Sequence, residues 1–380
     1  MRYTIVAKTL QGLENVLAQE LQEFGAENVR ILKRAVSCNG ELGLLYAANI
    51  HVRTALKILV ELHSFHAKNE SELYKGIRAI AWDDILDNDT TFAIDSTVYS
   101  KYFTHTQYPA LKMKDAIADG FRESTGKRPS VDREDPDVRF NLHISDDLVT
   151  VSLDSSGSSL HKRGYRTGNH PAPISEVLAA GMLYLSGWTP ATPLRDPMCG
   201  SGTIPIEAAL MATHTAPGLL RKHFGFQRWK NYDQSLFRSL MVDAAAAVKE
   251  IPVQIVGSDK DARFVEMAKR HAAQAGMEKY IQFSVARFED THAEGELLIM
   301  NPPYGERMRE TEITELSKQI GDVLKQNYPG CSAWVFSGNP QAAKFIGLKP
   351  SAKIPMKNGP LDSVFLRFDI RSGKYYPRKE

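Results

Sequence analysis

The sequence has few cysteines and lacks long apolar runs. Cys38, Cys199 and Cys331 stand far apart and form no Cys-x-x-Cys pair, which argues against a disulfide framework and against structural zinc. No apolar run reaches the roughly 18 residues of a membrane span, and the segment 1–7 lacks the apolar core of a signal peptide. We therefore expect reduced thiols, a cytoplasmic location, no metal site and no membrane partner.

The sequence also lacks a strong excess of charge of one sign. Lys and Arg number 47 against 45 Asp and Glu, for a formal net charge of +2. Any nucleic-acid binding must therefore use local basic patches rather than a global field. An apolar share of 43% in 380 residues is that of an ordinary globular protein with two or three domains.

The segment 196–203, Asp-Pro-Met-Cys-Gly-Ser-Gly-Thr, is predicted to join a strand to a helix. Its glycines, Gly200 and Gly202, allow close approach of a ligand to the backbone. The helix that follows directs free N–H groups and a positive dipole end toward such a ligand. A Gly-x-Gly alone is weak evidence, because it is often only a tight turn.

Two further apolar segments end in polar residues. The strand predicted at 254–259 ends in Asp259, and the strand at 298–300 runs into Asn301-Pro302-Pro303-Tyr304. Consecutive prolines restrict the backbone and leave carbonyl groups with no N–H beside them. Asp259-Lys260-Asp261 could alternatively be only an N-cap pair at a helix start.

These motifs resemble the class I S-adenosylmethionine-dependent methyltransferases that act on exocyclic amines of bases. The resemblance implies that Asn301, Pro302 and Tyr304 hold the target amine. It also implies a set of donor-binding residues, namely Asp196, Met198, Gly200, Gly202, Thr203, Asp259, Lys260, Arg287, Phe288 and Asn301. Transfer of the methyl group would convert the donor to S-adenosylhomocysteine. Cys199 lies in the donor loop, so we interpret it as a small loop residue and not a nucleophile.

The chain departs from the family pattern in two places. Asp259 lies about sixty residues after the glycines, where a minimal fold has about twenty, because of an insert at 213–250. Arg287 occupies a position where relatives often carry an Asp that meets the adenine amine, so only the backbone near Arg287 and Phe288 is expected there. The insert is expected to hold two helices, with Phe224, Phe226 and Trp229 used in packing.

The segment 1–65 shows the order strand, helix, strand, strand, helix, strand, which predicts a ferredoxin-like domain. Its expected hairpin pairs 29–37 with 42–45 and turns at Asn39-Gly40. Leu59–Phe65 is expected to be its last strand.

Residues 66–166, with helices, a strand hairpin and the exit segment 154–166, resemble the RNA-binding THUMP domain. The resemblance implies phosphate contacts from a basic set made up of Lys112, Lys114, Lys127, Arg128, Lys162, Arg163 and Arg166. The alternative is that these are solvated surface charges.

The predicted architecture is α/β, with ferredoxin-like (1–65) and THUMP (66–166) α+β domains before a Rossmann-like, seven-stranded class I methyltransferase domain (167–380). This layout resembles a bacterial group that methylates N2 of guanosine in 23S ribosomal RNA, with that RNA or a ribosome assembly intermediate as partner. Three alternatives remain: a transfer-RNA guanosine-N2 methyltransferase, an adenine-N6 DNA methylase, and a non-catalytic RNA-binding assembly factor.

Overall fold

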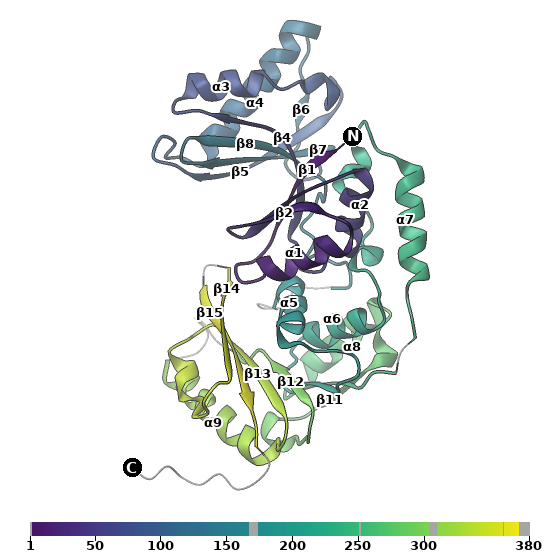
Figure 1. The fold of residues 1–380 in the computed structure, drawn as a ribbon, viewed down its shortest axis with the longest axis vertical. Helices are drawn as coiled ribbons and strands as arrows, with labels where there is room; N and C mark the ends of the chain where they lie inside the picture. The colour runs from purple at the N-terminus through teal and green to yellow at the C-terminus, as the bar shows by residue number, and fades with distance from the viewer. Residues whose placement is uncertain (1, 167–173, 251, 304–309, 360, 372–380) are drawn as a thin grey trace.

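The protein is elongated, with the first half of the chain at one end and the second half at the other (Figure 1). The computed structural model describes residues 2–166, 174–250, 252–303, 310–359 and 361–371. None of the helices in these ranges is long and apolar enough to cross a membrane.

The N-terminal module has the predicted ferredoxin-like order. Its elements are β1 (Tyr3–Lys8), α1 (Glu14–Glu23), β2 (Glu27–Leu32), β3 (Ala35–Gly40), α2 (Leu42–His51) and β4 (Lys57–His66). Strand β1 pairs antiparallel with both β3 and β4. The apolar stripe of α1 faces the core, as its spacing predicts. Helix α2 has no such stripe, because seven of its ten residues are buried.

The predicted turn at Asn39-Gly40 is wrong, because the hairpin turns at Lys33-Arg34 and Leu42 begins α2. Arg34 takes a left-handed φ of 58°, and its N–H donates to Glu14 Oε1 at 3.1 Å, so this turn is stabilised from α1. Gly40 is needed for a different reason: a Cβ there would lie 2.1 Å from Cδ2 of Leu44. The glycine at position 40 is therefore explained by close packing against Leu44 and not by a turn.

The second module continues the same sheet. Its elements are α3 (Glu70–Arg78), β5 (Thr91–Tyr99), α4 (Gln107–Thr125), β6 (Ser130–Val131), β7 (Val138–Ser145) and β8 (Leu148–Asp154). Because β4 pairs with β1 on one side and β8 on the other, one eight-stranded sheet runs in the order β2-β3-β1-β4-β8-β7-β5-β6. The two modules are thus joined through hydrogen-bonded strands rather than a flexible linker.

The C-terminal half forms the predicted seven-stranded sheet, in the order β11-β10-β9-β12-β13-β15-β14. Its strands β9 to β13 are parallel, and β15 pairs antiparallel with β13 and β14. The elements are α5 (Glu176–Ser186), β9 (Leu194–Asp196), α6 (Thr203–Ala212), β10 (Ile255–Asp259), α8 (Ala262–Gln274), β11 (Ile281–Val285), β12 (Leu297–Met300), α9 (Glu310–Asn327), β13 (Ser332–Ser337), β14 (Ala352–Asn358) and β15 (Leu361–Asp369).

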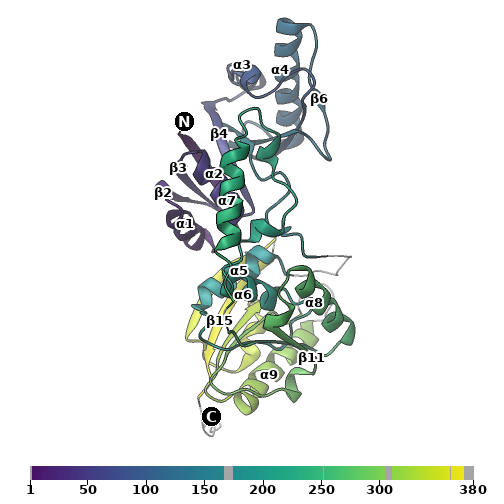
Figure 2. The ribbon, with the colours of Figure 1, turned by 90° about the vertical axis from the view of Figure 1, so that its right-hand side faces the viewer.

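The insert between α6 and β10 packs on the other half of the molecule. It contains one α-helix, α7 (Gln234–Ala246), and two 3₁₀ turns, so the expected second helix is absent from its described residues. Helix α7 lies beside α2 (Figures 1 and 2). Phe226 stacks on Tyr46 of α2 with ring centroids 4.2 Å apart, and Phe224 and Trp229 join the same buried cluster. The prediction that these aromatics serve packing is confirmed.

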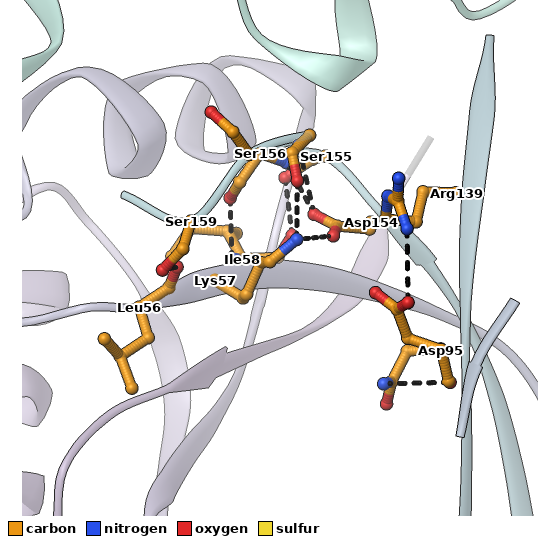
Figure 3. A network of polar contacts seen from close by, with 12 residues as sticks. Leu56, Lys57, Ile58, Asp95, Arg139, Asp154, Ser155, Ser156 and Ser159 are labelled. Carbon is orange, nitrogen blue, oxygen red and sulfur yellow. Dashed lines mark hydrogen bonds and ion pairs between the residues drawn. The ribbon is translucent and has the colours of Figure 1, made fainter. Parts of the chain in front are cut away.

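The exit from the eight-stranded sheet is held by a buried polar network (Figure 3). Lys57 contacts the buried Asp154 carboxylate and donates to the Gly157 carbonyl at 2.5 Å. Asp154 also accepts from the backbone N–H of Ser156 at 2.9 Å, and Ser156 Oγ accepts from the N–H of Ile58 at 2.9 Å. The polar run at 154–159 is therefore an anchored junction rather than a loose linker.

Candidate active site

Three polar residues lie at the carboxyl ends of neighbouring parallel strands. Asp196 ends β9 and Asp259 ends β10, while Asn301 follows β12. Strand β9 lies between β10 and β12, so the strand order reverses at this position. Open α/β sheets bind ligands in the crevice at such a reversal point.

The loop between β9 and α6 depends on its two glycines. Gly200 and Gly202 have φ values of +52° and +81°, in the left-handed region that side chains disfavour. A Cβ on Gly202 would also lie 2.8 Å from Cβ of Ala268 on α8. Gly202 is the N-cap of α6, so the loop delivers the N–H groups of that helix to the crevice.

The two acids of the site have different roles. Asp196 is buried and accepts from the N–H of Met198 at 3.2 Å. Burial raises the pKa of Asp196 well above its ordinary value, and the neighbouring Asp259 adds to this. Asp259 accepts from the N–H of Gly200 and from that of Asp261, each at 3.0 Å. A carboxylate has about four acceptor positions, so Asp259 retains capacity for ligand hydroxyls.

The alternative reading of this segment as an N-cap pair applies only to Asp261. Its carboxylate accepts from the N–H of Arg263 at 2.9 Å at the start of α8. Asp259 lies outside the helix and supports the glycine loop instead.

The other predicted donor-site residues lie around this loop. Lys260 is exposed, and Arg287 is an exposed side chain paired with Glu289. The ring of Phe288 is buried and stacks on Tyr328 at 5.4 Å, so only its backbone is available to a ligand. Met198 packs against that same cluster. These placements agree with a backbone-lined adenine position near 287–288 but do not test it.

Asn301 is the most informative side chain at the end of β12. Its Oδ1 is buried and has no hydrogen-bond partner among the described residues. Pro302 beside it is buried and Pro303 is exposed. Tyr304, the third predicted catalytic residue, lies outside the described residues. A buried acceptor without a donor costs free energy unless a ligand supplies one.

Cys199 is held in the glycine loop. Its side chain is 7% exposed and burial raises the pKa of its thiol well above the ordinary value. Its N–H donates to the Ser258 carbonyl at 2.9 Å, which ties the loop to β10. A buried thiol with a raised pKa is a poor nucleophile. Within the described residues no group of three or more His, Cys, Asp or Glu could hold a metal ion.

The predicted RNA-contacting residues separate into two groups. Lys127, Arg128 and Lys162 are exposed to solvent. Lys112 and Lys114 are half-buried and pair with Glu70 at 3.7 Å and Asp115 at 2.9 Å. The first three keep their charge available to a phosphate, whereas the last two share theirs with a carboxylate.

The prediction that Arg163 contacts RNA is wrong. Its side chain is 1% exposed and lies 3.4 Å from Glu207 of α6. It also donates to the carbonyls of Arg53 at 2.5 Å and Leu160 at 2.8 Å. Arg163 therefore joins the N-terminal half to the C-terminal half.

Arg166 also lies away from the exposed basic surface. It is 21% exposed, lies 3.1 Å from Glu176, and donates to Thr203 Oγ1 at 2.8 Å. These contacts place it beside the glycine loop and favour a role there rather than in RNA binding.

The structure also shows a group that the sequence pattern missed. Tyr99 is 67% exposed at the end of β5, and Tyr102 follows with Lys101 and Lys68 at 5.0 and 6.0 Å from its ring centroid. Exposed aromatic and cationic side chains together suit stacking with unpaired bases. The available signal was the run Tyr-Ser-Lys-Tyr at 99–102, in which two aromatic residues lie close to a lysine.

The fold and the site together define a class I methyltransferase domain that follows a THUMP-containing N-terminal half. Family models match the chain in three places: an RlmL ferredoxin-like domain at 4–59, a THUMP domain at 67–154, and an RMKL-like methyltransferase domain at 163–367. The last match covers more than half of the chain, and the protein belongs to this RMKL-like methyltransferase family.

Known proteins resemble the chain over nearly its whole length. "Putative RNA methyltransferase slr0064" from Synechocystis is 40% identical over 369 residues, covering 96% of both chains. The structure of SMU.472, described as "a putative methyltransferase complexed with SAH", has a TM-score of 0.87 at 28% identity and covers 98% of this chain and 99% of that one. A Listeria monocytogenes protein titled a "predicted N6-adenine-specific DNA methylase" has a TM-score of 0.86 at 28% identity and covers 97% of each.

These findings confirm the predicted family and fold, and S-adenosylmethionine is the methyl donor. The residues of this chain fit that role, because a glycine loop, a helix N-terminus and two strand-end acids meet at one edge of the sheet. The residue assignments themselves remain predictions.

Replacing Asp259 by alanine should weaken donor binding by about 1.5–3 kcal/mol, because the family resemblance implies that its carboxylate accepts charge-assisted hydrogen bonds from the ribose hydroxyls of the donor. Titration calorimetry with S-adenosylhomocysteine measures this. Asp261→Ala is the matched control, since Asp261 caps α8 two residues away and should affect donor affinity little. Equal affinities of wild type and Asp259→Ala would contradict the assignment.

Proposed function

We propose that this protein transfers a methyl group from S-adenosylmethionine to an exocyclic amine of RNA, forming N2-methylguanosine in 23S ribosomal RNA. The observation that carries the proposal is the buried Oδ1 of Asn301, which lacks a hydrogen-bond partner among the described residues and lies at the strand end beside the donor loop.

Methylation of a base amine is difficult because the nitrogen lone pair is delocalised into the ring. The donor supplies an already activated methyl group when bound, so the chain needs no covalent nucleophile. Asn301 Oδ1 and the carbonyl of Pro302 would each accept one N–H of the amine. This would hold the nitrogen closer to tetrahedral and orient its lone pair, and positioning of this kind can supply several kcal/mol.

The target base must reach the site unpaired. A base within a duplex would have to be flipped out of its stack before the amine could meet Asn301. In the proposal Tyr304 stacks on that base, a contact that contributes about 1–3 kcal/mol in single-stranded nucleic-acid sites.

RNA is favoured over DNA by the domains that precede the catalytic half. The THUMP match at 67–154 supplies a module associated with RNA, and the Synechocystis relative is named an RNA methyltransferase. The Listeria neighbour is titled a DNA methylase, but a DNA substrate leaves the THUMP module without a role. The 23S ribosomal target rests on the combined RlmL ferredoxin-like and RMKL-like matches.

Nucleoside mass spectrometry of ribosomal RNA, transfer RNA and DNA from a strain lacking the protein tests the proposal. We expect N2-methylguanosine to decrease in 23S ribosomal RNA alone and to return with the purified protein and S-adenosylmethionine. Loss of the nucleoside from transfer RNA, or of N6-methyladenine from DNA, would identify the corresponding alternative. Unchanged modification in all three would favour a non-catalytic assembly factor.

The exposed basic pair Lys127 and Arg128 is expected to contact phosphates. Changing both residues to glutamate should weaken RNA binding. It should also reduce the magnitude of the slope of log affinity against log salt by about 1–2, because binding releases fewer counterions when two phosphate contacts are missing. Filter-binding titrations at several salt concentrations measure the slope, and calorimetry should show unchanged donor affinity.

Lys33 and Arg34 provide the matched control, because they form another exposed basic pair, in the β2–β3 turn of the first module. Their reversal to glutamate should change the slope less. Equal effects of the two double variants would mean that RNA responds only to overall charge, and would contradict a specific role for the THUMP module.

A further inference from the structure

Polar groups without partners are concentrated around the donor loop. Among the described residues ten buried side-chain nitrogen or oxygen atoms lack a hydrogen-bond partner. Half of them lie at or next to this loop, on Arg166, Ser175, Glu176, Ser258 and Asn301. The Arg166 atom is its Nε, which makes no hydrogen bond but is ion-paired with Glu176 Oε1 at 3.1 Å. Because native proteins satisfy most buried polar groups, a cluster of unsatisfied ones marks a place where a polar ligand binds.

Glu176 is the most unusual member of this cluster. It lies in the first turn of α5, its side chain is 3% exposed, and its Oε2 has no hydrogen-bond partner in the part of the chain that the structure describes. Burial raises the pKa of this carboxyl to about 7. The N-terminal end of α5 stabilises a negative charge there, and a hydrogen bond from the backbone N–H of Glu176 to its own carboxyl also lowers the pKa. Oε2 itself accepts no hydrogen bond from the described residues.

Arg166 connects Glu176 to the donor loop. Its guanidinium lies 3.1 Å from Oε1 of Glu176 and donates to Oγ1 of Thr203, the first residue of α6. It also donates to the carbonyl of Ile174 at 2.5 Å, just before α5. One oxygen of Glu176 is therefore held by Arg166, and the other is buried without a hydrogen-bond donor from the described residues.

A cationic hydrogen-bond donor is the chemistry that would satisfy this free oxygen. A buried carboxylate with an unmade hydrogen bond is costly. Arg166 and Arg163 both lower the pKa of Glu176 by their charge, but neither donates a hydrogen bond to Oε2. S-adenosylmethionine carries two positive groups, a sulfonium and an α-ammonium. Of these two cationic groups only the ammonium has N–H groups, so it is the one that can donate a charge-assisted hydrogen bond to Oε2.

We propose that Glu176 binds the α-ammonium of the methyl donor, and that Arg166 positions Glu176 against the glycine loop. The proposal rests on donor binding and does not depend on the RNA target. It adds a binding residue to the site at the start of α5, on the opposite side of the glycine loop in sequence from Asp259 and Asn301.

Calorimetry with two ligands tests the proposal. S-adenosylhomocysteine keeps the α-ammonium but has no sulfonium charge, and 5′-methylthioadenosine lacks the whole amino-acid group. We expect Glu176→Gln to weaken S-adenosylhomocysteine binding by about 10- to 100-fold, from the loss of a charge-assisted hydrogen bond. Its affinity for 5′-methylthioadenosine should stay within about twofold. Asp259→Ala is the comparison, because it should weaken both ligands, which share the ribose.

Equal losses for the two ligands in Glu176→Gln would overturn the proposal, since they would show a merely structural residue. No loss for either ligand would overturn it as well. If the variant does not fold, wild-type protein gives a second test: an analogue of S-adenosylhomocysteine without the α-amino group should bind at least about tenfold more weakly. Equal binding of that analogue would exclude an ammonium site. All of these measurements omit RNA, so a failure of the proposed RNA target leaves them unaffected.

Discussion

Replacing Asn301 by alanine is expected to reduce the rate of methyl transfer by about 100- to 1000-fold, the effect of removing one hydrogen-bonding group that orients a reacting centre. Affinity for the methyl donor should stay nearly intact, because in the proposed mechanism the Asn301 amide acts on the base. Single-turnover assays with labelled S-adenosylmethionine measure the rate, and calorimetry with S-adenosylhomocysteine measures the affinity.

Ser337→Ala is the matched control for this variant. Ser337 ends β13, the strand next to β12, and its hydroxyl bonds within its own turn to the Asn339 carbonyl at 3.0 Å. We expect its loss to change the rate by less than about threefold. A wild-type rate in Asn301→Ala, or a product methylated on ring carbon or ribose oxygen, would refute the amine-binding role.

Replacing Arg163 by alanine is expected to destabilise the protein by about 3–5 kcal/mol, because removing one partner of a buried pair leaves the other charge uncompensated. Glu207 is 0% exposed and would keep only Tyr165 Oη, at 3.2 Å, among the partners of the described residues. The carbonyls of Arg53 and Leu160 would lose their donor too. Thermal unfolding followed by calorimetry and circular dichroism measures the loss.

Lys162→Ala is the control for Arg163→Ala, one residue away along the chain. Lys162 is exposed and makes no ion pair among the described residues, so its removal should change stability by less than about 0.5 kcal/mol. Similar melting temperatures for the two variants would show that the buried pair does not stabilise the contact between the halves.

The structural role of Arg163 follows from its place between the two halves. Arg53, at the end of α2, donates to the carbonyls of Leu210 at 3.1 Å and Thr215 at 2.7 Å in the C-terminal half. Arg163 in turn donates to the Arg53 carbonyl and pairs with Glu207 on α6, the helix that begins at the donor loop. The THUMP-containing N-terminal half is therefore bonded to α6, the helix that follows the donor loop.

The motifs of the catalytic half could be read from the sequence because their physical causes are local. Gly200 and Gly202 are required by the backbone conformation of the loop itself, and an apolar run ending in Asp or Asn indicates a strand end wherever it lies in the fold. Parallel strands place their carboxyl ends at one edge, so Asp196, Asp259 and Asn301 could be expected together.

The error in the first module had a local cause as well. Asn39-Gly40 is a strong hairpin signal in sequence, but Gly40 is needed so that Leu44 can approach the strand. The sequence shows the same residue whether a glycine is required for a turn or for close packing. Only the neighbour that fills the space distinguishes them.

By itself the sequence determined the family, the strand and helix order, and the acids and amide at the donor edge. Only the tertiary structure decided which charges are available: Arg163 is buried against Glu207, Lys127 is exposed, and one oxygen of Glu176 has no partner among the described residues. The reason is that the residue type alone gives the charge of a side chain, whereas its burial and its partners depend on residues far away in the chain. The hydrogen bonds of Arg163 span up to 110 positions, and no local pattern records contacts over that distance.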